Sequence, residues 1–121
     1  MKLLFVDDQI ELLEIYEEEI SYHFPDFEIK TAANGVEALD LCKQIKFDMV
    51  FTDGKMPVMD GPEFARQLKE LQYPAHLVLI TGHHEFLGEL DEKSLNIQKI
   101  ILKPISFDGL LSYIKSVVEV I

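Results

Sequence analysis

Tryptophan is absent from the sequence, cysteine occurs only once, and basic residues are half as numerous as acidic ones. The single cysteine, Cys42, cannot form an internal disulfide, which is typical of a protein in a reducing compartment. No apolar run approaches the roughly 18 residues of a membrane span, so we expect no insertion into a membrane. Asp7 and Asp8 interrupt the first apolar run too early for a signal peptide. We therefore expect a cytoplasmic protein.

The shortage of basic residues also restricts the partners. Twenty-two acidic residues oppose 11 basic ones, which gives a formal net charge of −11. A surface of this sign repels phosphate backbones, so we expect no direct binding to nucleic acid. The length of 121 residues, with 48% hydrophobic and 27% charged residues, is ordinary for one folded domain. Because no repeat or linker interrupts the chain, we expect a single domain over residues 1–121, without an output domain.

Short apolar runs alternate with amphipathic stretches along the whole chain. The runs predict five strands, at residues 3–6, 27–31, 49–51, 77–80 and 97–102. The first and third are continuous and apolar, as expected for strands that are buried on both faces. The second alternates apolar residues with Glu28 and Lys30, so we expect it at an edge of the sheet.

Apolar residues between these runs recur every three or four positions, which predicts helices. The stripes start at Ile10, Val36, Phe64 and Phe107, and they run to Phe24, Cys42, Leu71 and Ile121. Asn34 and Asp60 are predicted to cap the second and third of these helices. Residues 83–96 are only loosely periodic, and they are the expected place of a further helix. Alternating strands and helices predict an α/β fold, with a parallel sheet covered by helices on both faces.

Polar residues stand where four of the predicted strands end. Asp7 and Asp8 follow the first strand, Asp53 the third, Thr81 the fourth and Lys103 the fifth. In a parallel sheet of this class, ligands bind outside the carboxyl ends of the strands. If the first and third strands are neighbours, three carboxylates meet there, and either some of them take up protons or a cation binds. Ligands that are all oxygen favour a hard ion such as Mg²⁺.

A carboxylate beside a metal ion, an ammonium group and a hydroxyl group has what is needed to carry a phosphoryl group. Each residue has an ordinary structural interpretation when it stands alone. An aspartate after a strand commonly caps a helix or closes a turn, and Lys103 can simply begin a loop. The joint occurrence at one edge of the predicted sheet favours the chemical interpretation.

Four segments together resemble the CheY-like receiver domain of two-component response regulators. They are residues 5–8 (FVDD), 51–61 (FTDGKMPVMDG), 80–82 (ITG) and 102–104 (LKP). The resemblance extends over the whole chain without a large insertion. It implies the flavodoxin-like fold, with a doubly wound sheet of five parallel strands in the order 2-1-3-4-5. It also implies a signalling protein, not an enzyme, although such domains catalyse their own phosphorylation and dephosphorylation.

The resemblance also implies roles for individual residues. Asp53 accepts a phosphoryl group from a phosphohistidine of a histidine kinase or histidine phosphotransfer protein. Asp8, Asp53 and the backbone carbonyl of Lys55 bind Mg²⁺, with Asp7 acting largely through bound water. Lys103, in a cis peptide bond with the following proline, pairs with the phosphoryl oxygens, and Thr81 moves to donate a hydrogen bond to them. A partner-binding face then changes, and a downstream output protein or a fused domain responds to it.

One departure from the family pattern and three other functions bear on this interpretation. Ile100 stands where the family usually has an aromatic residue that turns inward on activation. The sequence also allows a receiver domain that has lost phosphorylation and acts only as a docking module. A Mg²⁺-dependent phosphatase with an aspartyl nucleophile needs a second aspartate where Lys55 stands. A nucleotide or flavin binder would need a phosphate loop rich in Ser, Thr and Gly, in place of Asp7 and Asp8.

Overall fold

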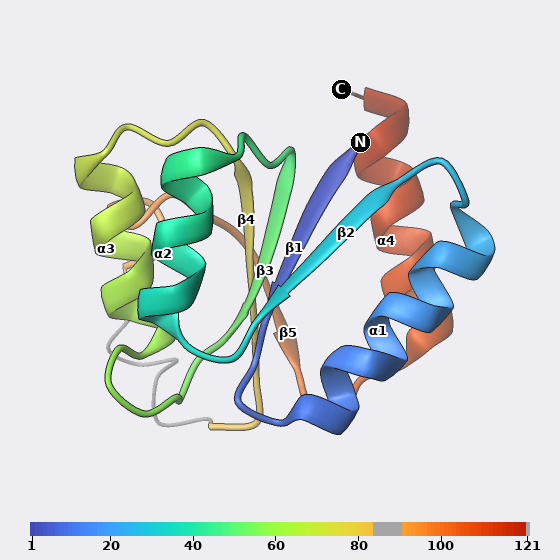
Figure 1. Ribbon diagram of the computed structural model, residues 1–121, viewed down its shortest axis with the longest axis horizontal. Helices are drawn as coiled ribbons and strands as arrows, with labels where there is room; N and C mark the ends of the chain where they lie inside the picture. The colour runs from blue at the N-terminus through green and yellow to red at the C-terminus, as the bar shows by residue number, and fades with distance from the viewer. Residues whose placement is uncertain (84–90, 121) are drawn as a thin grey trace.

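Figure 1 shows the computed structural model, which describes residues 1–83 and 91–120. The strands and helices follow one another as β1 (Lys2–Val6), α1 (Ile10–His23), β2 (Glu28–Ala32), α2 (Gly35–Gln44), β3 (Met49–Asp53), α3 (Gly61–Glu70), β4 (His76–Thr81), β5 (Ile97–Leu102) and α4 (Phe107–Val120). All neighbouring strands are parallel, and their order is β2-β1-β3-β4-β5. The predicted fold class and strand order are confirmed, and β2 lies at an edge as its alternating pattern indicated.

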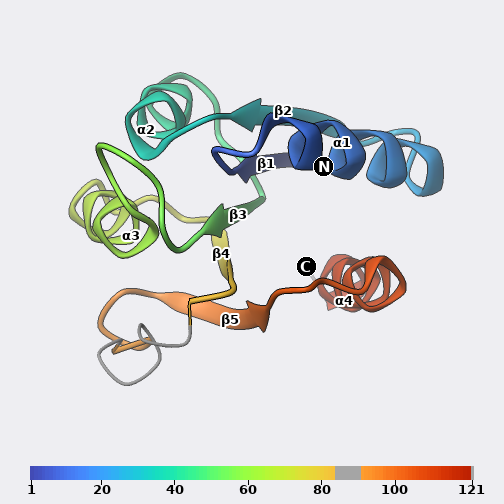
Figure 2. The same cartoon turned by 90° about the horizontal axis from the view of Figure 1, so that it is seen from below.

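The helices cover both faces of the sheet (Figure 2). The α2 and α3 helices pack against one face, where residues such as Leu4, Val50 and Phe64 form one buried cluster. The α1 and α4 helices cover the other face around a second buried cluster, to which Phe5 and Phe51 belong. The sheet is therefore buried on both sides, which explains why β1 and β3 read as continuous apolar runs.

Adjacent β1 and β3 create the point where the strand order reverses. In their register, Leu4 lies beside Val50 and Val6 lies beside Thr52. The residues that follow these pairs at the carboxyl ends are Asp7 and Asp53. The topology thus brings together two carboxylates that are far apart in the sequence, at the place where this class of sheet binds ligands.

The two predicted helix caps, Asn34 and Asp60, are confirmed by their hydrogen bonds. The Asn34 side chain accepts a hydrogen bond from the Glu37 N–H at 2.9 Å, and the Asp60 side chain does the same for the Glu63 N–H at 2.9 Å. The predicted apolar stripes are wrong at three of their end positions, because Ile10, Val36 and Leu71 are exposed. These three residues stand at helix ends, where their side chains contact solvent instead of the sheet.

The loosely periodic segment at 83–96 gives a mixed result. Residues 84–90 lie outside the described part of the chain, so the expected helix is not tested there. Residues 92–96 form turns, in which the Leu95 N–H donates to the Asp91 carbonyl at 3.0 Å and the Ile97 N–H donates to the Glu92 carbonyl at 2.9 Å. The chain passes from these turns directly into β5, which begins at Ile97.

Candidate functional site

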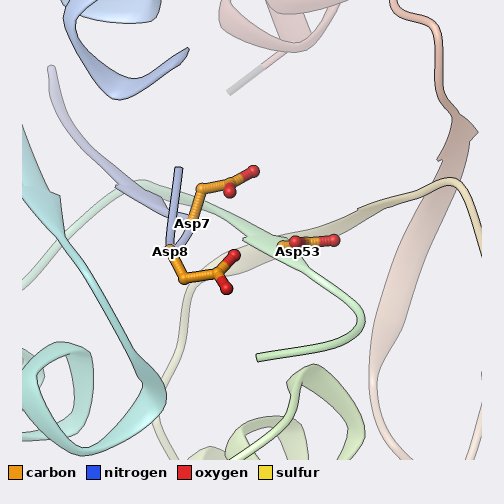
Figure 3. A group of neighbouring side chains, drawn as sticks. All are labelled: Asp7, Asp8 and Asp53. Carbon is orange, nitrogen blue, oxygen red and sulfur yellow. The ribbon is translucent and has the colours of Figure 1, made fainter. Parts of the chain in front are cut away.

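Three carboxylates meet at the carboxyl edge of the sheet (Figure 3). Asp7 and Asp8 follow β1, and Asp53 is the last residue of β3. One oxygen from each of them can be chosen so that all three lie within 4.8 Å of one another. Asp7 and Asp53 are only 2% and 7% exposed, whereas Asp8 is exposed to solvent. The predicted acidic cluster is therefore present, with two buried members and one at its mouth.

Lys103, which follows β5, brings a positive charge to the two buried carboxylates. Its Nζ lies 2.9 Å from Asp7 Oδ2 and 3.5 Å from Asp53 Oδ2. The peptide bond between Lys103 and Pro104 is cis, as the family resemblance implied. One ammonium group is thus shared between two carboxyl groups.

Backbone N–H groups hold the other oxygen of each buried carboxylate. The Gln9 N–H donates to Asp7 Oδ1 at 2.9 Å, and the Gly54 N–H donates to Asp53 Oδ1 at 2.8 Å. Burial raises the pKa of Asp53 above its usual value, while the nearby Lys103 opposes this shift. The Asp53 carboxylate is therefore fixed in orientation, and it lies where additional positive charge favours its ionised form.

Thr81 is buried at the end of β4, beside the strand that leads to Lys103. Its Oγ1 accepts a hydrogen bond from the His83 N–H at 3.0 Å, and its carbonyl accepts one from the Lys103 N–H at 3.0 Å. The side chain is fully enclosed. The structure thus places the predicted hydroxyl group on the strand between Asp53 and Lys103, held by the backbone that follows it.

A cleft of about 590 Å³ opens over these residues. It is lined by Asp8, Gln9, Asp53, Lys55, Met56, Pro57, Gly82, His83 and Lys103. Of the residues predicted from the sequence, Asp8, Asp53, Lys55 and Lys103 line the cleft, whereas Asp7 and Thr81 are buried behind its lining. A set of carboxylate oxygens at an open cleft fits a hard cation such as Mg²⁺, which binds through few protein ligands and keeps several of its waters.

Sequence reasoning missed the role of Gly61, the first residue of α3. Its N–H donates to the Gly54 carbonyl at 2.9 Å. A Cβ atom at this position would collide with the Asp53 carbonyl oxygen and would lie 2.9 Å from Leu79 Cδ1. The glycine allows α3 to start directly against the strand end that carries Asp53. The signal available in the sequence is a glycine immediately after the capping residue Asp60.

The loop between β3 and α3 also contains an unusual turn. The Met59 N–H donates to the Pro57 carbonyl at 2.8 Å, and Val58 between them has a φ of 70°. A γ-turn with positive φ is rare, and a β-branched residue makes it more strained. The Val58 side chain is 88% exposed, so no packing around it offsets the strain.

Five parallel strands with an acidic cluster, a lysine and a buried threonine at their carboxyl edge define a flavodoxin-like protein of the CheY-like class. Residues 3–115 match the family described as the response regulator receiver domain. The chain belongs to this family.

Relatives and solved structures agree with this assignment. Sporulation initiation phosphotransferase F of Bacillus subtilis is 30% identical over 118 residues, which cover 94% of this chain and 90% of that protein. The response regulator protein TrrA of Thermotoga maritima, solved in complex with Mg²⁺ and BeF, has a TM-score of 0.82 and 29% identity. That similarity covers 95% of this chain and 96% of the TrrA chain.

Other relatives are longer than this chain. The positive alginate biosynthesis regulatory protein of Pseudomonas aeruginosa is 33% identical over 85 residues, which cover 70% of this chain but 34% of that protein. Receiver domains are signalling domains of two-component systems, and they interact with histidine kinases or phosphotransfer proteins and with output domains. No helix within residues 1–83 and 91–120 is long and apolar enough to cross a membrane.

Proposed function

We propose that this domain accepts a phosphoryl group on Asp53 in a Mg²⁺-dependent reaction. The donor is a phosphohistidine of a histidine kinase or of a histidine phosphotransfer protein. The observation that carries the proposal is the position of Lys103 Nζ, 3.5 Å from Asp53 Oδ2 and 2.9 Å from Asp7 Oδ2, at the edge of an open cleft. The relative TrrA, which was solved with Mg²⁺ and BeF, supports the same chemistry.

In the proposed phosphoryl transfer, Asp53 is the nucleophile and the other residues of the site stabilise charge. The Asp53 carboxylate attacks phosphorus, a P–O bond forms, and the P–N bond to the donor imidazole breaks. Asp8, Asp53 and the Lys55 carbonyl would hold the cation, with Asp7 contacting it through water. Mg²⁺ bound there supplies positive charge to the phosphoryl oxygens. Lys103 supplies a second positive charge, and it is already held at the site by Asp7.

Phosphorylation of Asp53 would then change the conformation of Thr81 and of the elements around it. The Thr81 hydroxyl group leaves the His83 N–H and donates to a phosphoryl oxygen, which draws the end of β4 toward Asp53. Ile100 is half-buried on β5 and packs against the cluster under α2 and α3. Because an aliphatic side chain cannot make the aromatic movement usual in the family, we propose that the change passes through the backbone after Thr81. An output protein or a fused domain would respond to the altered face.

Intact-mass spectrometry after incubation with acetyl phosphate and Mg²⁺ tests the phosphoacceptor. The wild-type chain should gain one phosphoryl group, and Asp53→Asn should gain none. Asp40→Asn is the matched control, because Asp40 is an exposed aspartate on α2. Labelling of Asp53→Asn at the wild-type rate would disprove the assignment. A wild-type chain that gains no phosphoryl group would favour the docking-module alternative.

Thermal melting tests the cation separately from the phosphoryl transfer. Ions that bind only the folded state stabilise it by mass action, so millimolar Mg²⁺ should raise the melting temperature of the wild-type chain. Asp8→Ala removes the exposed member of the cluster and should abolish most of this rise. Equal rises in the two proteins would show that the ion binds elsewhere.

A further inference from the structure

Tyr16, in the middle of α1, is a tyrosine whose side chain is almost completely buried. The side chain is 2% exposed, and within the described residues its hydroxyl has no hydrogen-bond partner. Burying a polar group without a partner is costly, and a phenylalanine would fill the same space without this cost. The position therefore calls for an explanation other than packing.

The ring of Tyr16 packs against the strands that lead into the acidic site. It stacks on Phe5 with 4.8 Å between centroids, and Phe5 stacks on Phe51 at 4.6 Å. Asp7 and Asp53 come two residues after Phe5 and Phe51 on β1 and β3. Since side chains alternate along a strand, both carboxylates project from the face that Tyr16 covers. Tyr16 belongs to the same buried cluster as Phe5 and Phe51, on the face of the sheet from which the two carboxylates project.

Two further observations connect Tyr16 with the site. The charges of Asp7 and Asp53 add to the effect of burial in raising the pKa of Tyr16, so its hydroxyl keeps its proton and is a donor. The Tyr16 ring also contacts Phe107 at 5.9 Å between centroids. Phe107 begins α4, four residues after Lys103, so this contact links Tyr16 to the segment that follows the lysine.

We propose that Tyr16 is a positioning residue of the phosphorylated state, and that its hydroxyl donates to Asp7 when Lys103 turns to the phosphoryl group. This inference rests on the proposed phosphorylation of Asp53. Before phosphorylation, Lys103 is the donor to Asp7 Oδ2. A phosphoryl group on Asp53 competes for that lysine and leaves a buried carboxylate oxygen without its donor. Tyr16 provides an unused donor on the same face.

The test is the affinity for beryllofluoride and Mg²⁺, a stable mimic of the phosphoryl group, measured by titration calorimetry. Tyr16→Phe should bind this mimic about tenfold more weakly than the wild-type chain, which corresponds to about 1.4 kcal/mol. Without ligand, Tyr16→Phe should be at least as stable to urea as the wild-type chain, because it loses no hydrogen bond and removes an unpaired hydroxyl.

Tyr113→Phe is the matched control. The Tyr113 hydroxyl bonds to His76 Nε2 at 2.6 Å, near the opposite end of β4 from Thr81. This variant should lose stability but keep its affinity for the mimic. Tyr16→Phe with an affinity within twofold of wild type, or equal weakening in both variants, would overturn the inference. A wild-type chain that does not bind the mimic would instead remove the proposed function on which the inference depends.

Discussion

A methyl group at position 61 would meet backbone that cannot easily move aside. Gly61 starts α3 and is buried against the end of β3. A Cβ atom built on it lies 2.9 Å from Leu79 Cδ1 and 3.0 Å from Gly54 Cα, and it collides with the carbonyl oxygen of Asp53. Two of these three neighbours are backbone atoms at the site itself, so Gly61→Ala must shift the start of α3 away from the sheet.

The size of the effect follows from this lack of room. Overpacking a well-packed region costs roughly 1 to 3 kcal/mol, and backbone neighbours yield less than side chains do. We therefore expect Gly61→Ala to lower the free energy of unfolding by about 2 to 4 kcal/mol, and the melting temperature by roughly 10 °C. Because the Asp53 carbonyl must move, phosphorylation by acetyl phosphate should slow as well.

Gly109→Ala is the control that separates crowding from the general effect of the substitution. Gly109 is exposed in the first turn of α4, and a Cβ there would make only ordinary contacts of 3.5 and 3.6 Å with Ser106. Alanine favours a helix over glycine, so this variant should gain about 0.5 kcal/mol. Urea unfolding followed by circular dichroism measures both. A Gly61→Ala variant that is as stable as wild type would show that the close approach of α3 to β3 is not needed for the stability of the fold.

Three further predictions concern other parts of the chain. Burial lowers the pKa of His76, so below about pH 6.5 the unfolded chain takes up a proton that folded His76 resists, and stability falls; His76→Gln should flatten this slope in urea titrations at pH 5 to 7. Burial raises the pKa of the Cys42 thiol to about 11, so a thiol reagent at pH 8 should leave the folded chain unmodified and react at once in urea; rapid reaction of the folded chain would contradict this. Asn34→Ala removes the cap of α2 and should cost about 1 kcal/mol by thermal melting, whereas Asn34→Asp should cost little.

The sequence was most informative where local chemistry and periodicity agreed. The edge position of β2 followed from its alternating residues, and the start of α2 followed from Asn34 with Glu37. The acidic cluster followed from where Asp7 and Asp53 stand relative to the strands. In each case the signal lies within a few residues, and the rules of parallel α/β sheets provide the rest.

The remainder depends on contacts between distant segments. Val36 stands three residues before the buried Leu39, so periodicity places it on the buried side of α2. Its exposure depends on what packs against the first turn of the helix, and periodicity does not provide this information. The γ-turn at Val58 contradicts the preference of a β-branched residue. The stack of Tyr16 on Phe5 needs the distance between α1 and β1, which periodicity does not provide.

The ion pair between Lys103 and Asp7 joins residues that are 96 positions apart in the chain. Because the chain is synthesised from its N-terminus, Asp7 and Asp53 are both made long before Lys103, whose positive charge lies beside their carboxylates. That lysine follows β5, which pairs with β4 and, among the described residues, lies at an edge of the sheet. Proteins open locally in cooperative units whose opening costs less than global unfolding. An opening that displaces β5 would take Lys103 away from Asp7 and Asp53, so the site is complete only when this edge strand is in place.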